Sequence, residues 1–215
     1  MIFPIGDDQV KGGSFPLFSY GFLFLNIIVF VAQHSSDSRL MEFAVRPAEI
    51  IAGNNFYTLI SSLFLHGDWM HLLFNMLFLW IFADNIEATI GNFRFLVFYL
   101  FGGIVATFAH ILFNAQSMVP LIGASGSIST VLGAYLVLFP NSRIKTFVFF
   151  FFINIPAYIF LGLWIGQQTI NGLYSIGGTN AGGSGVAWWA HIGGFVFGYI
   201  VGRYWKNKYE PRLLI

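Results

Sequence analysis

The chain has 215 residues, of which 57% are hydrophobic and only 9% are charged. A soluble globular domain carries about 25% charged residues, so this chain has too few to cover a water-facing surface. Its 27 Phe and 24 Gly residues suit lipid-facing helices that pack closely through small side chains. The lack of cysteine excludes disulfides, thiolate metal sites and a cysteine nucleophile. We therefore predict an all-α, polytopic membrane protein.

Six apolar stretches are long enough to cross a bilayer, since a membrane-spanning helix needs about 20 apolar residues. They are residues 15–33, 69–86, 93–113, 119–139, 144–165 and 186–204. The first stretch is too long for the apolar core of a signal peptide and lacks a small-residue cleavage site, so we expect it to be retained. No repeat of fixed period is visible, and we predict a single membrane domain over residues 1–215.

The two longest predicted connections differ in character. Residues 34–68 carry charged side chains that indicate a structure at the membrane interface, among them Arg39, Glu42, Arg46 and Glu49. Residues 166–185 contain the stretch SIGGTNAGGSG, which predicts a flexible loop.

Basic residues set the expected orientation, because cytoplasmic loops of membrane proteins are enriched in Lys and Arg. With the N-terminus inside, only Arg39 and Arg46 lie outside. The inner side then holds Lys11, Arg94, Arg143, Lys145, Arg203, Lys206, Lys208 and Arg212. We expect both termini to be cytoplasmic.

Polar side chains gather near the outer ends of three spans that run inward. They are His71 and Asn75 in the second span, Ser125 in the fourth and His191 in the sixth. At 1.5 Å per residue, Ser125 lies about 8 Å below the outer end of its span. Polar groups are costly in lipid, so we expect these side chains to face one another inside the bundle.

Small residues offer a way to bring the fourth and sixth spans together, because small-xxx-small stripes allow close helix approach in membranes. On the sixth span the stripe is Gly194, Gly198 and Gly202, near the face of His191. On the fourth span we expect the matching stripe to be Ser125, Ser129 and Gly133. If the stripes face each other, Ser125 and His191 come within hydrogen-bonding distance.

A serine beside a histidine is the minimal activated nucleophile, since the hydroxyl needs a base to take its proton. Ser125 follows Pro120 in the first turn of its span, where unpaired backbone N–H groups can stabilise an oxyanion. His71 and Asn75 could add side-chain donors. Asp84 and Glu87 lie at the inner end of the second span, so we expect a dyad rather than a triad.

Three motifs on these spans together resemble the rhomboid family of intramembrane serine proteases. They are GASG at 123–126, HGDWMHLLFN at 66–75 and AHIGGFVFG at 190–198, and the resemblance covers roughly residues 15–205. It implies a six-transmembrane-helix rhomboid-like bundle and a serine endopeptidase that cleaves transmembrane segments of membrane proteins near the outer face.

The resemblance also implies a role for each matching residue. Ser125 would be the nucleophile and His191 the general base and acid. His71, Asn75 and the Ser125 backbone N–H would form the oxyanion hole, with Gly123 allowing the turn. The fifth span, with its Phe-rich run at 147 and 149–152 and a kink expected at Pro156, resembles the family's lateral gate, and loop 166–185 resembles its cap.

Two positions depart from the family's pattern. Many relatives carry a Trp–Arg pair in the first outer loop, where this chain has only AVRPAE at 44–49. Relatives often have an aromatic residue one turn after the nucleophile, packed on the base, where this chain has Ser129.

Other interpretations of these residues remain open. A membrane serine often bonds back to the carbonyl four residues earlier, and a membrane histidine often packs against another polar group. An inactive rhomboid-like protein that binds membrane helices is the main alternative function. A transporter is disfavoured because no paired helix breaks or inverted repeats are visible.

We expect no cofactor or metal, because His66 and His71 are five residues apart, about 140° around a helix, and no H-E-x-x-H motif is present. The expected partners are transmembrane protein substrates and the lipid bilayer, not nucleic acid, while the oligomeric state stays open. The absence of cysteine and the short soluble tails suggest a multi-pass protein of a prokaryotic plasma membrane.

Overall fold

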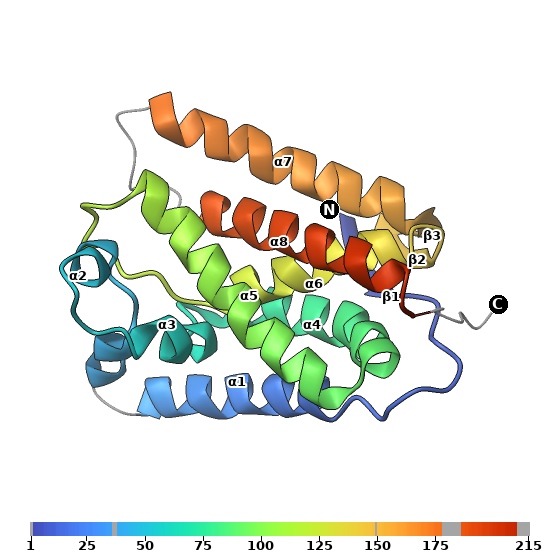
Figure 1. The fold of residues 1–215 in the computed structure, drawn as a ribbon, viewed down its shortest axis with the longest axis horizontal. Coiled ribbons are helices and arrows are strands. Elements are labelled where there is room, and N and C mark those ends of the chain that lie inside the picture. Colours follow the sequence, from blue (N-terminus) through green and yellow to red (C-terminus); the bar gives the residue numbers. More distant parts are fainter. Residues whose placement is uncertain (1, 36–37, 149, 178–185, 210–215) are drawn as a thin grey trace.

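The computed structural model describes residues 2–35, 38–148, 150–177 and 186–209. Long helices lie roughly side by side, with α1 along one edge and α7 along the opposite edge (Figure 1). The long helices are α1 (Leu17–Ser35), α4 (Trp69–Ile90), α5 (Asn92–Phe113), α6 (Ser125–Leu138), α7 (Ala157–Gly177) and α8 (Trp188–Lys206).

Between α1 and α4 the chain forms short helical turns, η1 (Ser38–Phe43), α2 (Pro47–Ile51), α3 (Thr58–Ser61) and η2 (Ser62–Phe64). They gather at the end of the bundle opposite the β-strands (Figure 1). An isolated bridge between Val45 and Leu121 ties this region to the segment before α6. The region therefore braces the entry into α6.

Three of the described helices are long and apolar enough to cross a membrane, Leu17–Ser35, Trp69–Ile90 and Asn92–Asn114. The apolar helix α6 is shorter, with 14 residues. Every residue of α6 from Gly126 to Leu138 is buried except Leu136, so α6 forms the centre of the bundle. Because protein rather than lipid surrounds it, α6 can carry polar residues such as Ser129 and Thr130.

The α8 glycine stripe packs on α6, as the sequence predicted. A Cβ atom at Gly198 would overlap the Thr130 carbonyl, and one at Gly202 would lie 2.9 Å from the Ala134 Cα. The predicted stripe on α6 was wrong by one residue, however. The α8 stripe meets Gly126, Thr130 and Ala134, and Gly133 of the predicted stripe packs against the Phe195 carbonyl.

This one-residue difference has a geometric reason. Successive helical residues are rotated by about 100°, so placing Gly126 and Thr130 against α8 turns Ser125 and Ser129 aside, toward the neighbouring pocket. Gly126, Thr130 and Ala134 thus form the interface with the α8 glycines, and Ser125 lines the cavity.

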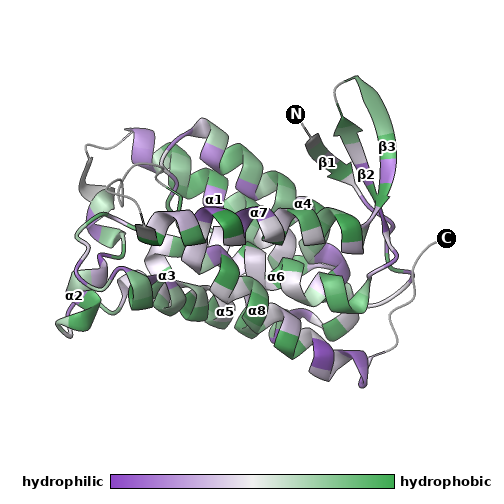
Figure 2. Ribbon diagram, turned by 90° about the horizontal axis from the view of Figure 1, so that it is seen from above, coloured by the Kyte–Doolittle hydropathy of each residue, from purple (hydrophilic) through white to green (hydrophobic). Residues whose placement is uncertain are grey.

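The predicted fifth span, 144–165, was wrong at its start. Instead of helix, the chain forms an antiparallel hairpin of two strands, β2 (Arg143–Val148) and β3 (Phe151–Pro156). Strand β1 (Ile2–Gly6) pairs with β2, which gives a sheet of order β1-β2-β3. β-Branched and aromatic residues in this segment favour extended backbone. Figure 2 shows the sheet standing to one side of the helices.

The Phe-rich run and the proline kink that the resemblance assigned to this span are therefore not found in a helix. Phe147, Phe151 and Phe152 lie in the hairpin rather than on a helix, and residue 149 is outside the described residues. Pro156 ends β3 and precedes the first residue of α7, a place that proline tolerates, so it kinks no helix.

The predicted loop 166–185 is largely helical. Helix α7 continues to Gly177, and residues 178–185 are outside the described residues. This extension adds about three turns to α7 and places Gln168 on a helix next to α8.

Candidate active site

Ser125 is the first residue of α6, and the turn before it depends on Gly123. Gly123 has φ +121°, a conformation that residues with a Cβ rarely adopt, and its N–H donates to the Ser62 carbonyl at 3.0 Å. A Cβ at this position would lie 2.7 Å from His71 Nε2. Gly123 therefore allows both the turn and the close approach of His71.

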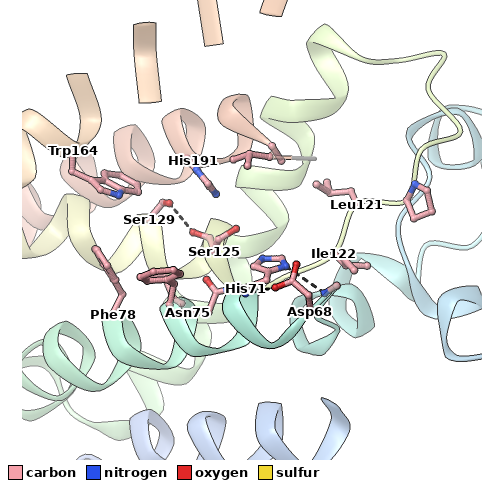
Figure 3. Close-up of a pocket in the computed structure, with 16 residues that line it drawn as sticks. Asp68, His71, Asn75, Phe78, Leu121, Ile122, Ser125, Ser129, Trp164 and His191 are labelled. Atoms are coloured by element: carbon pink, nitrogen blue, oxygen red, sulfur yellow. Dashed lines mark hydrogen bonds between the residues drawn. The ribbon is translucent and has the colours of Figure 1, made fainter. Parts of the chain in front are cut away.

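A pocket of about 580 Å³ opens in front of Ser125. Four of the sequence-predicted side chains line it, His71 and Asn75 from α4, Ser125 from α6 and His191 from α8 (Figure 3). The fifth predicted residue, Gly123, contacts this group through His71. The fold thus gathers residues from three helices that are distant in sequence.

Ser125 and His191 face the same cavity, as Figure 3 shows. Within the described residues, no hydrogen bond joins them, and the ring nitrogen Nδ1 of His191 instead lies 2.8 Å from Gln168 Oε1. Catalytic hydrogen bonds are often long in a free enzyme and tighten only with substrate. The arrangement is therefore compatible with proton transfer once a substrate fills the pocket.

Aromatic rings from two helices surround His191. The Trp164 ring lies 5.9 Å from the His191 ring at a tilt of 34°, and the Trp188 ring lies at 6.3 Å and is perpendicular to it. Trp164 precedes Gln168 by four residues, so both belong to one face of α7.

Sequence reasoning missed Gln168 because the predicted fifth span ended at residue 165, and it assigned no role to Trp164 inside that span. The available signal was the pair of glutamines in the largely apolar stretch LGLWIGQQTI, the second of them four residues after a tryptophan. A buried polar residue at this spacing needs a partner on the facing helix.

Asn75 offers a free donor to the pocket. Its side chain is 6% exposed, and the Nδ2 atom has no hydrogen-bond partner among the described residues. An unpaired buried donor costs about 1–3 kcal/mol, so such a group is retained where a ligand or transition state uses it.

Hydrogen bonds orient His71 so that its ring can also donate to the pocket. Its backbone N–H donates to Asp68 Oδ1 at 2.8 Å, which caps α4, and its Nδ1 accepts a 3.4 Å hydrogen bond from the Gly67 N–H. If Nδ1 accepts, the proton of the neutral ring is on Nε2. That nitrogen lies on the Gly123 side of the ring, toward the turn before Ser125.

His66 packs behind His71, with ring centres 5.1 Å apart, and is only 1% exposed. Burial lowers the pKa of His66 to about 4, so the ring is neutral at pH 7. Its backbone N–H and carbonyl both hydrogen-bond to the Gln33 side chain. No three His, Asp or Glu side chains cluster as a metal site would require in the part of the chain that the structure describes.

The family model of the rhomboid domain matches residues 53–208, which include Ser125 and His191. The chain belongs to the rhomboid family. The apolar helices and this membership make it an integral membrane protein.

Similar proteins include the rhomboid protease GluP of Bacillus subtilis, 31% identical over 189 residues, 86% of this chain and 34% of that protein. Rhomboid protein 1, mitochondrial, of Saccharomyces cerevisiae is 30% identical over 164 residues, 72% of this chain and 43% of that protein. Presenilin-associated rhomboid-like protein A, mitochondrial, of Danio rerio is 36% identical over 88 residues, 40% of this chain and 23% of that protein. The chain thus spans less than half the length of these three relatives.

Proposed function

We propose that this rhomboid is an intramembrane serine endopeptidase that uses a Ser125–His191 dyad to cleave transmembrane segments. The observation that carries the proposal is the pocket in which Ser125, His191 and the unpartnered Asn75 amide meet. A protein that only bound helices would have no need of a free donor beside a serine and a histidine.

The reaction begins when His191 takes the Ser125 hydroxyl proton and Oγ attacks the substrate carbonyl carbon. The negative charge that develops on the carbonyl oxygen is stabilised by the Ser125 backbone N–H, the His71 ring and Asn75 Nδ2. The His191 imidazolium then gives its proton to the leaving amine as the peptide bond breaks. A water molecule, deprotonated by His191, hydrolyses the acyl-enzyme and restores the serine.

We assign one membrane span to each of the six long helices, with both termini in the cytoplasm and one domain over the whole chain. The eight-to-two distribution of Lys and Arg supports this orientation. Helix α6 is short, but because the bundle surrounds it, it need not match the bilayer thickness by itself. A prokaryotic plasma membrane remains our proposal for the location, although similar proteins include mitochondrial ones.

The predicted fourth span, 119–139, begins as a helix only at Ser125, so the expected depth of about 8 Å by helical rise does not apply. Cleavage should still occur near the outer face, because Ser125 is at the end of α6 that the proposed orientation places outside. Substrate segments with small or helix-breaking residues should be preferred, since a peptide must leave the helical conformation to expose its carbonyl. Mass analysis of the products from a model transmembrane substrate would locate the cut. A cut in the cytoplasmic half of the substrate helix would overturn the proposed orientation.

Fluorophosphonate labelling of the purified protein tests the nucleophile. We expect labelling and cleavage in the native protein and in Ser127→Ala, and neither in Ser125→Ala. Ser127 is a suitable control because it lies on the same helix turn but is fully buried beside Gly103. A Ser125→Ala protein that cleaves at the native rate would end the proposal. A folded native protein that is neither labelled nor active would favour the inactive, helix-binding alternative.

A further inference from the structure

The described side chains around His191 include one polar partner for its ring, Gln168 of α7. Gln168 Oε1 lies 2.8 Å from His191 Nδ1, and the glutamine is only 6% exposed. The contact joins two helices across 23 residues of sequence. Its short length and burial make it a defined interaction rather than a surface contact.

The chemistry of this contact determines where the imidazole proton is. An amide oxygen only accepts hydrogen bonds, so Nδ1 of His191 must be the donor. In a neutral ring the Nε2 atom then carries a lone pair. This is the state that a general base needs, because Nε2 is the ring nitrogen left free to take the Ser125 proton.

Ser129 does not perform this role. Its hydroxyl donates to the Ser125 carbonyl at 2.6 Å, whereas His191 Nδ1 pairs with Gln168 Oε1. The described part of the chain also has no carboxylate hydrogen-bonded to His191. Trp164 is one turn before Gln168, and its ring centre lies 5.9 Å from that of His191, which restricts the orientation of the imidazole. Helix α7 therefore supplies the contacts that hold the base.

We propose that Gln168 is the positioning residue that fixes the tautomer and orientation of His191, completing a Ser125–His191–Gln168 chain. The role of this chain in catalysis rests on the proposed function. The glutamine holds the ring as a third group holds the base in other serine hydrolases, but without a charge. The position of α7 then determines whether His191 is oriented for proton transfer.

The test compares Gln168→Met, which keeps the length but removes the acceptor, with Gln168→Glu, which keeps an acceptor oxygen in either protonation state. Gln167→Met is the matched control, because Gln167 is adjacent to Gln168 on the same helix but is exposed. We expect Gln168→Met to lower kcat by about tenfold with KM unchanged, because one oriented hydrogen bond to the base is lost. Gln168→Glu should retain most of the rate, and Gln167→Met all of it.

Nitrogen NMR of ¹⁵N-histidine-labelled protein provides a readout that is independent of activity. The native protein should show His191 with its proton on Nδ1, and Gln168→Met should shift the ring toward the other tautomer. A native ring with its proton on Nε2, or a Gln168→Met protein with native kcat and tautomer, would overturn the inference. Absence of fluorophosphonate labelling at Ser125 would instead contradict the proposed function, and the NMR result would still decide whether Gln168 sets the ring.

Discussion

Ser129 donates its hydroxyl hydrogen bond to the Ser125 carbonyl, which ties the first turn of α6 together behind the nucleophile. One neutral hydrogen bond contributes about 0.5–1.5 kcal/mol. We therefore expect Ser129→Ala to slow cleavage by roughly tenfold at most, measured as kcat on a model transmembrane substrate. Ser129→Tyr should fold and remain active, because residue 129 lines the pocket and its side chain can extend into it. Complete loss of activity in a folded Ser129→Ala protein would place the hydroxyl in the catalytic apparatus.

Asn75 should contribute to the rate rather than to substrate binding, because its Nδ2 is unpaired until an oxyanion forms. Removing one oxyanion donor typically lowers kcat by about 10²–10³. We expect an effect of this size in Asn75→Ala, with His71→Ala also acting on kcat. Steady-state kinetics would separate kcat from KM.

Asn26→Ala is the control for the Asn75 experiment. Asn26 is another buried asparagine, but it lies on α1 and its Nδ2 donates to the Phe22 carbonyl at 2.7 Å, away from the pocket. It should leave kcat unchanged. A rise in KM alone in Asn75→Ala would assign Asn75 to substrate binding instead.

At the scale of elements, the contact between α6 and α8 determines where His191 lies relative to Ser125. Backbone meets backbone at Gly194 against Gly126 and at Gly198 against Thr130. Backbone atoms of α6 and α8 cannot move aside as the end of a flexible side chain can. The distance between the two proposed catalytic residues is therefore set by glycines a few residues away.

Gly198→Ala should separate these helices, because the added methyl would overlap the Thr130 carbonyl. Overpacking of this kind costs about 1–3 kcal/mol. We expect a lower Tm in detergent and a loss of cleavage from a displaced His191. Gly162→Ala on α7 is the matched control, since no atom lies within 4 Å of its added Cβ. It should raise stability by about 0.5–1 kcal/mol through helix propensity. Equal Tm values for the two variants would contradict the close approach.

At the scale of the whole molecule, the N-terminal segment joins the sheet to the helical bundle. Asp7 follows β1, and its carboxylate accepts hydrogen bonds from Tyr135 of α6 and from Asn85 Nδ2 of α4, the latter at 2.7 Å. Asp7 is 7% exposed. Burial, with a smaller contribution from the nearby Asp84, raises the pKa of Asp7 from 3.8 to about 7.

This raised pKa makes stability depend on pH. The folded protein binds a proton at Asp7 more tightly than the unfolded chain does, so the stabilisation is complete below pH 3.8 and is lost as the pH rises through about 7. We expect the Tm in detergent to fall between about pH 4 and pH 7, and Asp7→Asn to weaken that fall. Thermal unfolding at several pH values measures both. The same pH dependence in the two proteins would show that Asp7 does not titrate in this range.

Much of the candidate site could be predicted from the sequence, because helical periodicity is a local property. The spacing of His71 and Asn75, the turn at Gly123 and the glycine stripe of α8 each depend on neighbours within a few residues. The structure brings these predicted side chains to one pocket. Their catalytic roles still await the kinetic tests.

Other features depend on contacts between distant parts of the chain. Periodicity alone does not separate a helix from a strand in a short apolar run, and Arg143–Val148 and Phe151–Pro156 form strands where β2 pairs with Ile2–Gly6 at the other end of the sequence. The face of α6 that meets α8 was also misjudged by one residue, since Ser129 and Thr130 are both small enough for close packing. Gln168 is a partner of His191 because α7 continues past residue 165 and lies beside α8. Local patterns specify which side chains each helix carries, whereas the pairing of elements selects which of them meet, because packing energies arise between residues far apart in the chain.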